Sequence, residues 1–291
     1  YHWTQWIFKR LYEDVFAKYI DMPVNWCEEL GTVLSNDEVI DGKSERGGYP
    51  VVRKNMYQWV IDQPAFAEKL LEGLEDIDWP ESTKEMQRNW IGKSTGVEVD
   101  FEIAGGGKFS IFTTCIETIY GITFMVLAPD GDITKSLLDR VENREEVEAY
   151  IAETLKKNDM DRTELNKGKS GCCLKGIYAV NPVNGKQVPV FIGDFVLASY
   201  GTGAVMAVPS HDQRDFEYAQ FHGIPMIQVI EGDVSESALE KYSYLGKGLH
   251  MMNSEEFTGM VVEDAKEAIT CKLEKMGVAK RTVNYHFREW I

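Results

Sequence analysis

The spacing of apolar positions changes along the chain, and these changes predict its secondary structure. Residues 2–20 and 56–74 carry apolar side chains three or four positions apart among Lys and Glu, which predicts two amphipathic helices. Between them, a turn-rich stretch to about residue 55 predicts two or three short strands. A Trp-Pro-Glu-Ser break at residues 79–82 then precedes a short helix or turn over 85–90.

From residue 96 onward the pattern is mainly that of a sheet. Alternating apolar residues over 97–103, a Gly-Gly-Gly turn and a return over 108–113 predict a β-hairpin. Further strands are predicted over 121–128, 176–180, 187–191, 194–198, 204–208, 226–229 and 282–287. Helices are predicted over 132–156, 211–222 and 254–276. The fold class is therefore mixed α/β, with a largely antiparallel, β-barrel-like sheet surrounded by helices.

Composition indicates a folded chain of more than one domain. Its 291 residues are 44% hydrophobic. Neither an N-terminal signal nor a membrane-spanning apolar run is visible, so we expect a soluble, cytoplasmic protein without membrane contact. Five scattered cysteines without a CxxC pair favour a reducing compartment. The net charge of −16 argues against broad contact with a phosphate backbone, so a nucleic acid should meet only a small local site.

The segment over residues 200–215 has the richest chemistry: Tyr-Gly-Thr-Gly-Ala-Val-Met-Ala-Val-Pro-Ser-His-Asp-Gln-Arg-Asp. Its glycines allow a backbone to approach a ligand closely, and the helix start after the proline offers free N–H groups. Ser210 and Gln213 have the spacing of a capping box, which leaves Asp212 and Asp215 on one face. These carboxylates could hold an amine, or they could simply serve the helix start and a nearby cation.

A second segment, residues 112–121, reads Phe-Thr-Thr-Cys-Ile-Glu-Thr-Ile-Tyr-Gly and places three threonines within six positions. A threonine hydroxyl can bond to backbone, phosphate or ribose, while its methyl group shapes a pocket wall. Taken alone, this segment would be a turn that follows a strand.

Together the two segments resemble the editing (connective peptide 1) domain of bacterial-type leucyl-tRNA synthetases. The resemblance extends over nearly the whole chain, through Val-Asn-Trp-Cys at 24–27, Met-Gln-Arg-Asn-Trp-Ile-Gly-Lys-Ser at 86–94 and Arg-Glu-Trp-Ile at 288–291. It implies hydrolysis of mischarged tRNA(Leu) carrying norvaline or isoleucine. Such a second site is needed because an apolar pocket resolves one methyl group by only about 1–3 kcal/mol. Isoleucyl- and valyl-tRNA synthetases carry related domains and are the near alternatives.

The resemblance also implies roles for individual residues. Asp215 would bind the α-ammonium of the misplaced amino acid, and Thr118 would lie against the γ-branch of leucine and exclude it. Further contacts would come from Thr113 and Thr114 near the ester and ribose, Met206 and Val208 on the apolar side, Tyr200 and Leu197 beside the terminal adenosine, and His211 and Asp212 near the amine. Water would be the nucleophile, activated by positioning and by dipoles.

Departures from the family pattern leave alternatives open. The family usually reads Thr-Thr-Arg-Pro-Asp-Thr, whereas Cys115, Ile116 and Glu117 stand here in place of Arg, Pro and Asp. A chain altered in this way could be a tRNA 3′-end binding module that no longer hydrolyses. Cys115 could instead be a nucleophile with His211 as its base, although no oxyanion or orienting signature accompanies the pair.

The Asn-Trp-Cys sequence that often opens a zinc knuckle in relatives keeps only Cys27, whereas a tetrahedral site needs four ligands. We therefore expect no metal and no cofactor in this chain, ATP and Mg being used by a full-length enzyme. The expected organisation is a helix from the catalytic nucleotide-binding domain (1–20), a degenerate knuckle (21–55), a helical junction (56–92), the editing domain (93–276) and a return strand (277–291). Such a piece of a synthetase would be a deacylase without ligase activity. Its partners would be the 3′ end of tRNA(Leu) and the rest of the same chain, as a monomer.

Overall fold

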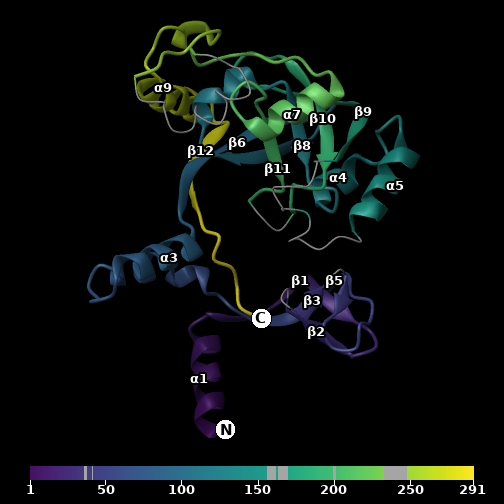
Figure 1. Cartoon of the computed structure of the whole chain (residues 1–291), viewed down its shortest axis with the longest axis vertical. Helices are drawn as coiled ribbons and strands as arrows, with labels where there is room; N and C mark the ends of the chain where they lie inside the picture. The colour runs from purple at the N-terminus through teal and green to yellow at the C-terminus, as the bar shows by residue number, and fades with distance from the viewer. Residues whose placement is uncertain (36–37, 41, 156–161, 163–169, 199–200, 233–247) are drawn as a thin grey trace. The chain divides into compact units, whose positions relative to one another are not determined.

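The computed structural model describes residues 1–35, 38–40, 42–155, 162, 170–198, 201–232 and 248–291 (Figure 1). The chain divides into two compact units. The smaller contains Tyr1–Ser94 and Val283–Ile291, and the larger contains Thr95–Leu155 and the described residues from 162 to 282. None of the helices in the described ranges combines the length and the apolar character needed to cross a bilayer.

The smaller unit holds an N-terminal helix, an antiparallel sheet, a separate pair of short strands and a helical segment that follows the sheet. Its elements are α1 (His2–Glu13), β1 (Ala17–Cys27), β2 (Thr32–Leu34), β3 (Val39–Ile40), β4 (Lys43–Ser44), β5 (Val52–Ile61), η2 (Pro64–Phe66), α2 (Ala67–Gly73) and α3 (Glu81–Ile91). The sheet has the order β2-β1-β5, and β3 pairs separately with β4.

Two predicted helices of this unit are wrong over part of their length. The helix expected over 2–20 ends at Glu13, and after Val15, whose φ is +65°, the chain enters β1. The helix expected over 56–74 is the strand β5 up to Ile61, and helix begins only at Ala67. The reason is cross-strand pairing: Tyr19 lies opposite Trp59, with ring centroids 5.2 Å apart. Such pairs stabilise a sheet and outweigh the helical spacing of each segment alone.

The larger unit is built on a seven-stranded sheet. Its strands are β6 (Ser94–Ile103), β7 (Lys108–Thr113), β8 (Phe124–Leu127), β9 (Gly171–Val180), β10 (Gln187–Gly193), β11 (Ala204–Ala207) and β12 (Ala279–Asn284). The order is β11-β8-β10-β9-β6-β12, and β7 pairs with β6 as the predicted hairpin. The mixed α/β class is confirmed, but in the described part of the chain the sheet stays open and does not close into a barrel.

The helices of the larger unit are α4 (Asp132–Leu137), α5 (Arg144–Thr154), α7 (Gln213–His222) and α9 (Val262–Lys275), with the short 3₁₀ helices η3 (Ile116–Gly121) and η4 (Glu255–Phe257). The single helix predicted over 132–156 is thus two helices. The strands predicted over 194–198 and 226–229 are wrong. The first is a turn closed by a hydrogen bond from the Val196 amide to the Gly193 carbonyl, and the second has no regular secondary structure.

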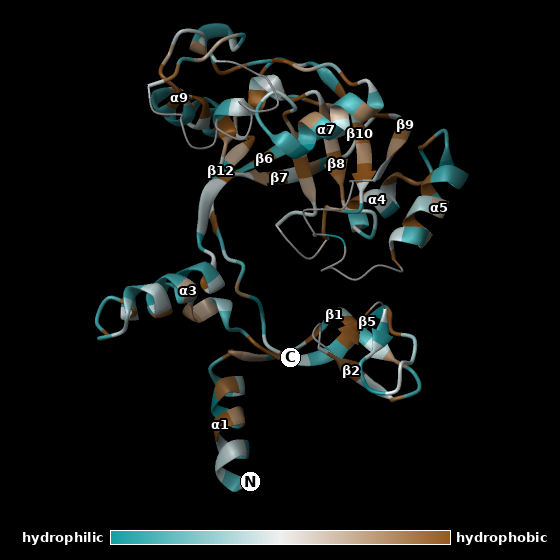
Figure 2. Ribbon diagram, viewed as in Figure 1, coloured by the Kyte–Doolittle hydropathy of each residue, from teal (hydrophilic) through white to brown (hydrophobic). Residues whose placement is uncertain are grey.

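Both faces of the central strands are buried. Along β8, Phe124 and Val126 pack beneath α7, where the ring of Tyr218 stacks on Phe124 with centroids 5.2 Å apart. The alternate residues Met125 and Leu127 belong to the main core cluster, which also contains apolar residues of η3 and α9. Figure 2 accordingly shows the central strands largely in the brown of hydrophobic residues and α7 largely in the teal of hydrophilic ones. A strand buried on both faces is a rigid base for the loops that leave its ends.

Candidate functional site

The second segment, residues 112–121 (the threonine turn), leaves the end of β7, turns tightly and continues through η3. The Cys115 amide donates to the Thr113 hydroxyl at 3.0 Å, and the Thr118 hydroxyl donates to the Cys115 carbonyl at 2.8 Å. Thr118 is buried, whereas Thr114 is exposed, with its hydroxyl 3.6 Å from the Cys115 sulfur. The hydroxyls of Thr113 and Thr118 therefore shape the turn, and Thr114 is the threonine whose side chain faces solvent.

Helix α7 begins with a carboxylate cap. Asp212 is the N-cap, and its side chain accepts hydrogen bonds from the amides of Arg214 at 2.9 Å and Asp215 at 3.2 Å. The predicted capping box of Ser210 and Gln213 is wrong, because the helix starts two residues later than that box requires. An aspartate at this position supplies an acceptor for otherwise unpaired amides and meets the positive end of the helix dipole.

The second carboxylate of the first helical turn folds back onto the strand. The Asp215 side chain accepts a hydrogen bond from the Val208 amide at 2.8 Å. Burial opposes the ionisation of Asp212, but its hydrogen bonds and its ion pair with Arg214 prevail and hold the pKa of Asp212 below its usual value. The first turn of α7 therefore carries two aspartates: Asp212, which is ionised, and Asp215, whose carboxylate is oriented by the Val208 amide.

His211 is tied to a neighbouring segment by its ring. Its Nε2 accepts hydrogen bonds from the amides of Val229 at 2.9 Å and Ile230 at 3.3 Å. A ring nitrogen that accepts from two amides carries no proton, so the neutral tautomer has its proton on Nδ1. Burial lowers the pKa of His211 to about 4, and the ring is neutral at physiological pH.

The two segments singled out in the sequence lie against each other. Strand β11 pairs with β8, and the Thr123 amide donates to the Ala207 carbonyl at 3.2 Å. At the end of η3, a Cβ on Gly121 would stand 2.9 Å from Cγ1 of Val208, so only glycine allows this approach. Val208 is buried and Met206 half-buried, and both pack with the core cluster that includes η3. The threonine turn and the α7 start thus form one continuous region.

Cys115 lies in the threonine turn, and its surroundings disfavour a thiolate. Desolvation, followed by the negative charges of Glu117 and Asp212, raises the pKa of the Cys115 thiol. A cysteine nucleophile needs the opposite, a nearby positive charge or base. With Nε2 of His211 engaged by two backbone amides, the arrangement does not favour a Cys115–His211 catalytic pair.

Two further residues of the predicted site lie on the connection from β10 to β11. Leu197 is buried there, and Tyr200 lies outside the described residues. Sequence reasoning also missed a contact of the region with α9, where the Lys266 ammonium stands 4.0 Å from the Glu117 carboxylate. No local signal could have revealed that pair, because its two residues are far apart in the chain.

The described residues contain no group of three or more His, Cys, Asp or Glu side chains placed to hold a metal ion. Cys27, the remnant of a knuckle sequence, ends β1 as a fully buried side chain with a free thiol. The described residues around Cys27 therefore do not supply the ligands of a tetrahedral zinc site.

Comparison with known proteins identifies the larger unit. Residues 88–274 match the family model of the leucyl-tRNA synthetase editing domain. Among solved structures, the chain is similar to agnB2 leucyl-tRNA synthetase of Agrobacterium radiobacter K84 in its ternary complex with tRNA and LeuAMS, with 29% identity and a TM-score of 0.76. The match covers 98% of this chain but 32% of that one, so the chain spans about a third of its relative. The chain belongs to the leucyl-tRNA synthetase editing-domain family.

Proposed function

We propose that this chain is the post-transfer editing region of a leucyl-tRNA synthetase, which hydrolyses norvaline and isoleucine esters of tRNA(Leu) and spares the leucine ester. The observation that carries the proposal is the contact of the threonine turn with the α7 start, through Gly121 and Val208, within a chain of this family. This contact brings into one region a carboxylate that can pair with an ammonium group, Asp215, and a buried side chain at the turn, Thr118.

In the proposed complex Asp215 is the partner of the substrate ammonium. Its carboxylate stands at the positive end of a helix and is oriented by the Val208 amide, so its charge is held in place before substrate arrives. Asp212 supports it by capping the same helix and, being ionised, adds negative potential near the amine. His211 is neutral, and by accepting hydrogen bonds from the amides of Val229 and Ile230 it holds that segment in place.

Leucine exclusion depends on bulk at Thr118. Since its hydroxyl is committed to the Cys115 carbonyl, the part of Thr118 left for contact with substrate is its methyl group. Thr113 and Thr114 lie at the ester and ribose, Met206 and Val208 line the apolar side, and Leu197 and Tyr200 flank the terminal adenosine. Hydrolysis then needs a water molecule positioned by backbone and hydroxyl dipoles, with no protein nucleophile.

The proposed partners are the 3′ end of mischarged tRNA(Leu) and the remainder of a synthetase chain, within a cytoplasmic monomer. The net charge of −16 disfavours extensive contact with RNA, so binding energy for the body of the tRNA must come from elsewhere. Helix α1 buries none of its residues, and Trp3 is 78% exposed, which supports contact with further synthetase residues.

The deciding experiment is a deacylation assay with purified norvalyl-, isoleucyl- and leucyl-tRNA(Leu), performed with this region within its full-length synthetase. We expect the first two esters to be cleared well above their spontaneous rates, and the leucine ester to persist. Binding of mischarged tRNA without turnover would instead support the alternative, a 3′-end binding module in which Cys115, Ile116 and Glu117 have replaced catalytic machinery. The same assay with mischarged tRNA(Ile) and tRNA(Val) tests the near alternatives. If the enzyme clears those and leaves mischarged tRNA(Leu) intact, the leucine assignment is wrong.

A further inference from the structure

A buried acidic residue lies in the threonine turn, directly before Thr118, and has no role in the proposed ester hydrolysis. The Glu117 side chain is 12% exposed, and its Oε2 is buried without a hydrogen-bond partner in the described part of the chain. Burial raises the pKa of Glu117 above its usual value. Keeping such a carboxyl costs free energy, so its position calls for a compensating interaction.

Two groups favour the charged carboxylate and so lower the pKa of Glu117 against burial: first the backbone of Glu117 itself, and then Lys266 of α9, while Glu263 of the same helix opposes them. The Lys266 ammonium stands 4.0 Å from Oε2 of Glu117, and it is a cation that favours the charged form of this carboxyl. A second lysine of the same helix reaches the same turn, because Nζ of Lys272 lies 3.1 Å from the Tyr120 hydroxyl. Apolar residues of η3 and α9 also share the main core cluster. Helix α9 thus contacts the threonine turn at two polar points joined by apolar packing.

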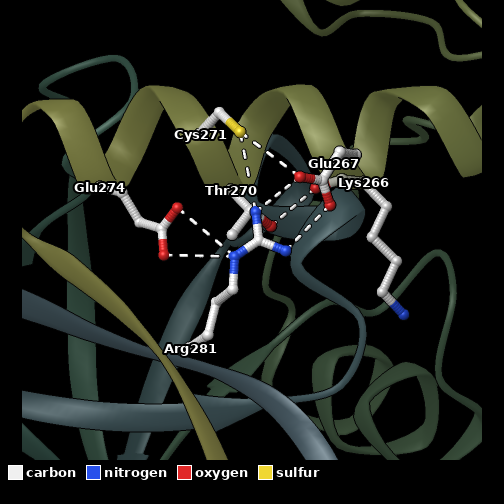
Figure 3. A network of polar contacts seen from close by, with 6 residues as sticks. All are labelled: Lys266, Glu267, Thr270, Cys271, Glu274 and Arg281. Carbon is white, nitrogen blue, oxygen red and sulfur yellow. Dashed lines mark hydrogen bonds and ion pairs between the residues drawn. The ribbon is translucent and has the colours of Figure 1, made fainter.

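Helix α9 is in turn anchored to the sheet by Arg281 of β12 (Figure 3). The guanidinium lies 2.6 and 2.9 Å from the two carboxylate oxygens of Glu267, and 3.3 Å from Glu274. In Figure 3 the side chain of Lys266 points away from this network, while its backbone carbonyl accepts the Thr270 hydroxyl at 2.7 Å. The Arg281 network therefore fixes the helix and leaves the Lys266 ammonium to act on the threonine turn.

We propose that Glu117 and Lys266 are positioning residues for specificity, whose charge pair holds η3 against α9 and thereby sets the place of the Thr118 methyl group. The inference rests on the proposed editing function and deepens it. Discrimination between norvaline and leucine depends on one branch methyl, so a shift of the turn by a fraction of an ångström would admit leucine. Neither Glu117 nor Lys266 needs to touch the substrate for this effect.

The test compares ester selectivity among variants of the full-length synthetase that contains this region. In Glu117→Gln and in Lys266→Met, hydrolysis of leucyl-tRNA(Leu) should rise about tenfold, while hydrolysis of norvalyl-tRNA(Leu) stays within about twofold of the parent rate. The double variant should show no further rise, because both changes remove the same interaction. Lys266→Arg keeps a cation at this position and should retain most of the selectivity.

The matched control is Glu267→Gln, which breaks the Arg281 pair one residue along the same helix. Arg281 keeps its contact with Glu274 in this variant, so α9 stays in place and the ratio of the two rates should not change. An unchanged ratio in both Glu117→Gln and Lys266→Met, or a parallel loss of both activities, would overturn the inference. If the wild-type enzyme leaves norvalyl-tRNA(Leu) intact, the proposed function itself is wrong. Failure of the proposed function can therefore be told apart from failure of this inference.

Discussion

The Asp215 carboxylate accepts a hydrogen bond from the Val208 amide, with 2.8 Å between oxygen and nitrogen. This bond spans the turn from β11 into α7 and places the carboxylate beside the end of β11, where Ala207 and Val208 are buried. Asp215 therefore has a structural role as well as its proposed role as partner of the ammonium. A substitution that removes the whole side chain would therefore abolish both roles at once.

Asp215→Asn separates these roles, because an amide oxygen can still accept from the Val208 amide but carries no charge. Loss of a charge pair of this kind costs roughly 2–5 kcal/mol, so we expect hydrolysis of norvalyl-tRNA(Leu) to fall about 30-fold or more. Thermal unfolding of this variant should match the parent. Asp215→Ala should lose activity to the same degree and also about 1 kcal/mol of stability. Full deacylation by Asp215→Asn would remove Asp215 from the ammonium site.

Thr118 allows its bulk and its hydroxyl to be tested independently. Thr118→Val keeps a branched side chain of the same size and loses the hydrogen bond to the Cys115 carbonyl. It should therefore lose about 1 kcal/mol of stability and still spare leucyl-tRNA(Leu). Thr118→Ala removes the bulk and should hydrolyse the correct product. If leucyl-tRNA(Leu) is equally stable with both variants, Thr118 does not provide steric exclusion.

How far the sequence predicted the fold depends on how local each interaction is. The hairpin of β6 and β7 was predicted because its alternation and its glycine turn lie within one short stretch. Strand β5 was not, because its aromatic residues are spaced like a helix and only pairing with β1 makes them a strand. The predicted bounds of an element were wrong where the strand that pairs with it lies far away in the sequence.

The site shows the same dependence on local and distant contacts. The sequence indicated the two segments, but it selected Ser210 as the cap of α7 where the structure has Asp212. Both residue types suit a helix start; here the amides of His211 and Asp212 bond to the Val208 carbonyl, which forms a separate turn and delays the helix. The Glu117–Lys266 pair had no local signal at all, since its position follows from how α9 packs on η3.

Protonation of His211 should make the stability of the fold sensitive to acid. Its pKa is about 4 in the folded protein and 6.5 in its unperturbed state, so the unfolded chain binds more protons between these values. Stability linked to His211 is then complete above pH 6.5 and is lost as pH falls towards 4, by at most about 3 kcal/mol. Urea unfolding at a series of pH values measures this loss.

The control for this titration is His211→Gln, whose amide oxygen can accept from the Val229 and Ile230 amides without titrating. The difference between the stability curves of parent and variant isolates the histidine from the carboxylates that titrate nearby. A difference that does not change between pH 7 and pH 4 would show that His211 is not protonated preferentially in the unfolded chain.

The knuckle-like sequence predicts a protein without structural zinc. Cys27 is the one cysteine of the smaller unit, and the described residues offer no set of three ligands around it. Elemental analysis after gel filtration should find zinc well below one ion per chain, and a chelator should leave the melting temperature unchanged. One zinc ion retained per chain would require ligands that this geometry does not provide.

Gly121 predicts how closely the threonine turn must approach β11. A Cβ at this position would lie 2.9 Å from Cγ1 of Val208 and 3.0 Å from the Ile227 carbonyl oxygen, and the latter belongs to backbone that cannot rotate away. Gly121→Ala should therefore cost about 1–3 kcal/mol of stability and displace the turn that carries Thr118. Gly73→Ala is a suitable control, since a Cβ there meets no atom within 4 Å. If Gly121→Ala melts at the parent temperature and keeps its ester selectivity, the packing of η3 on Val208 does not determine the geometry of the pocket.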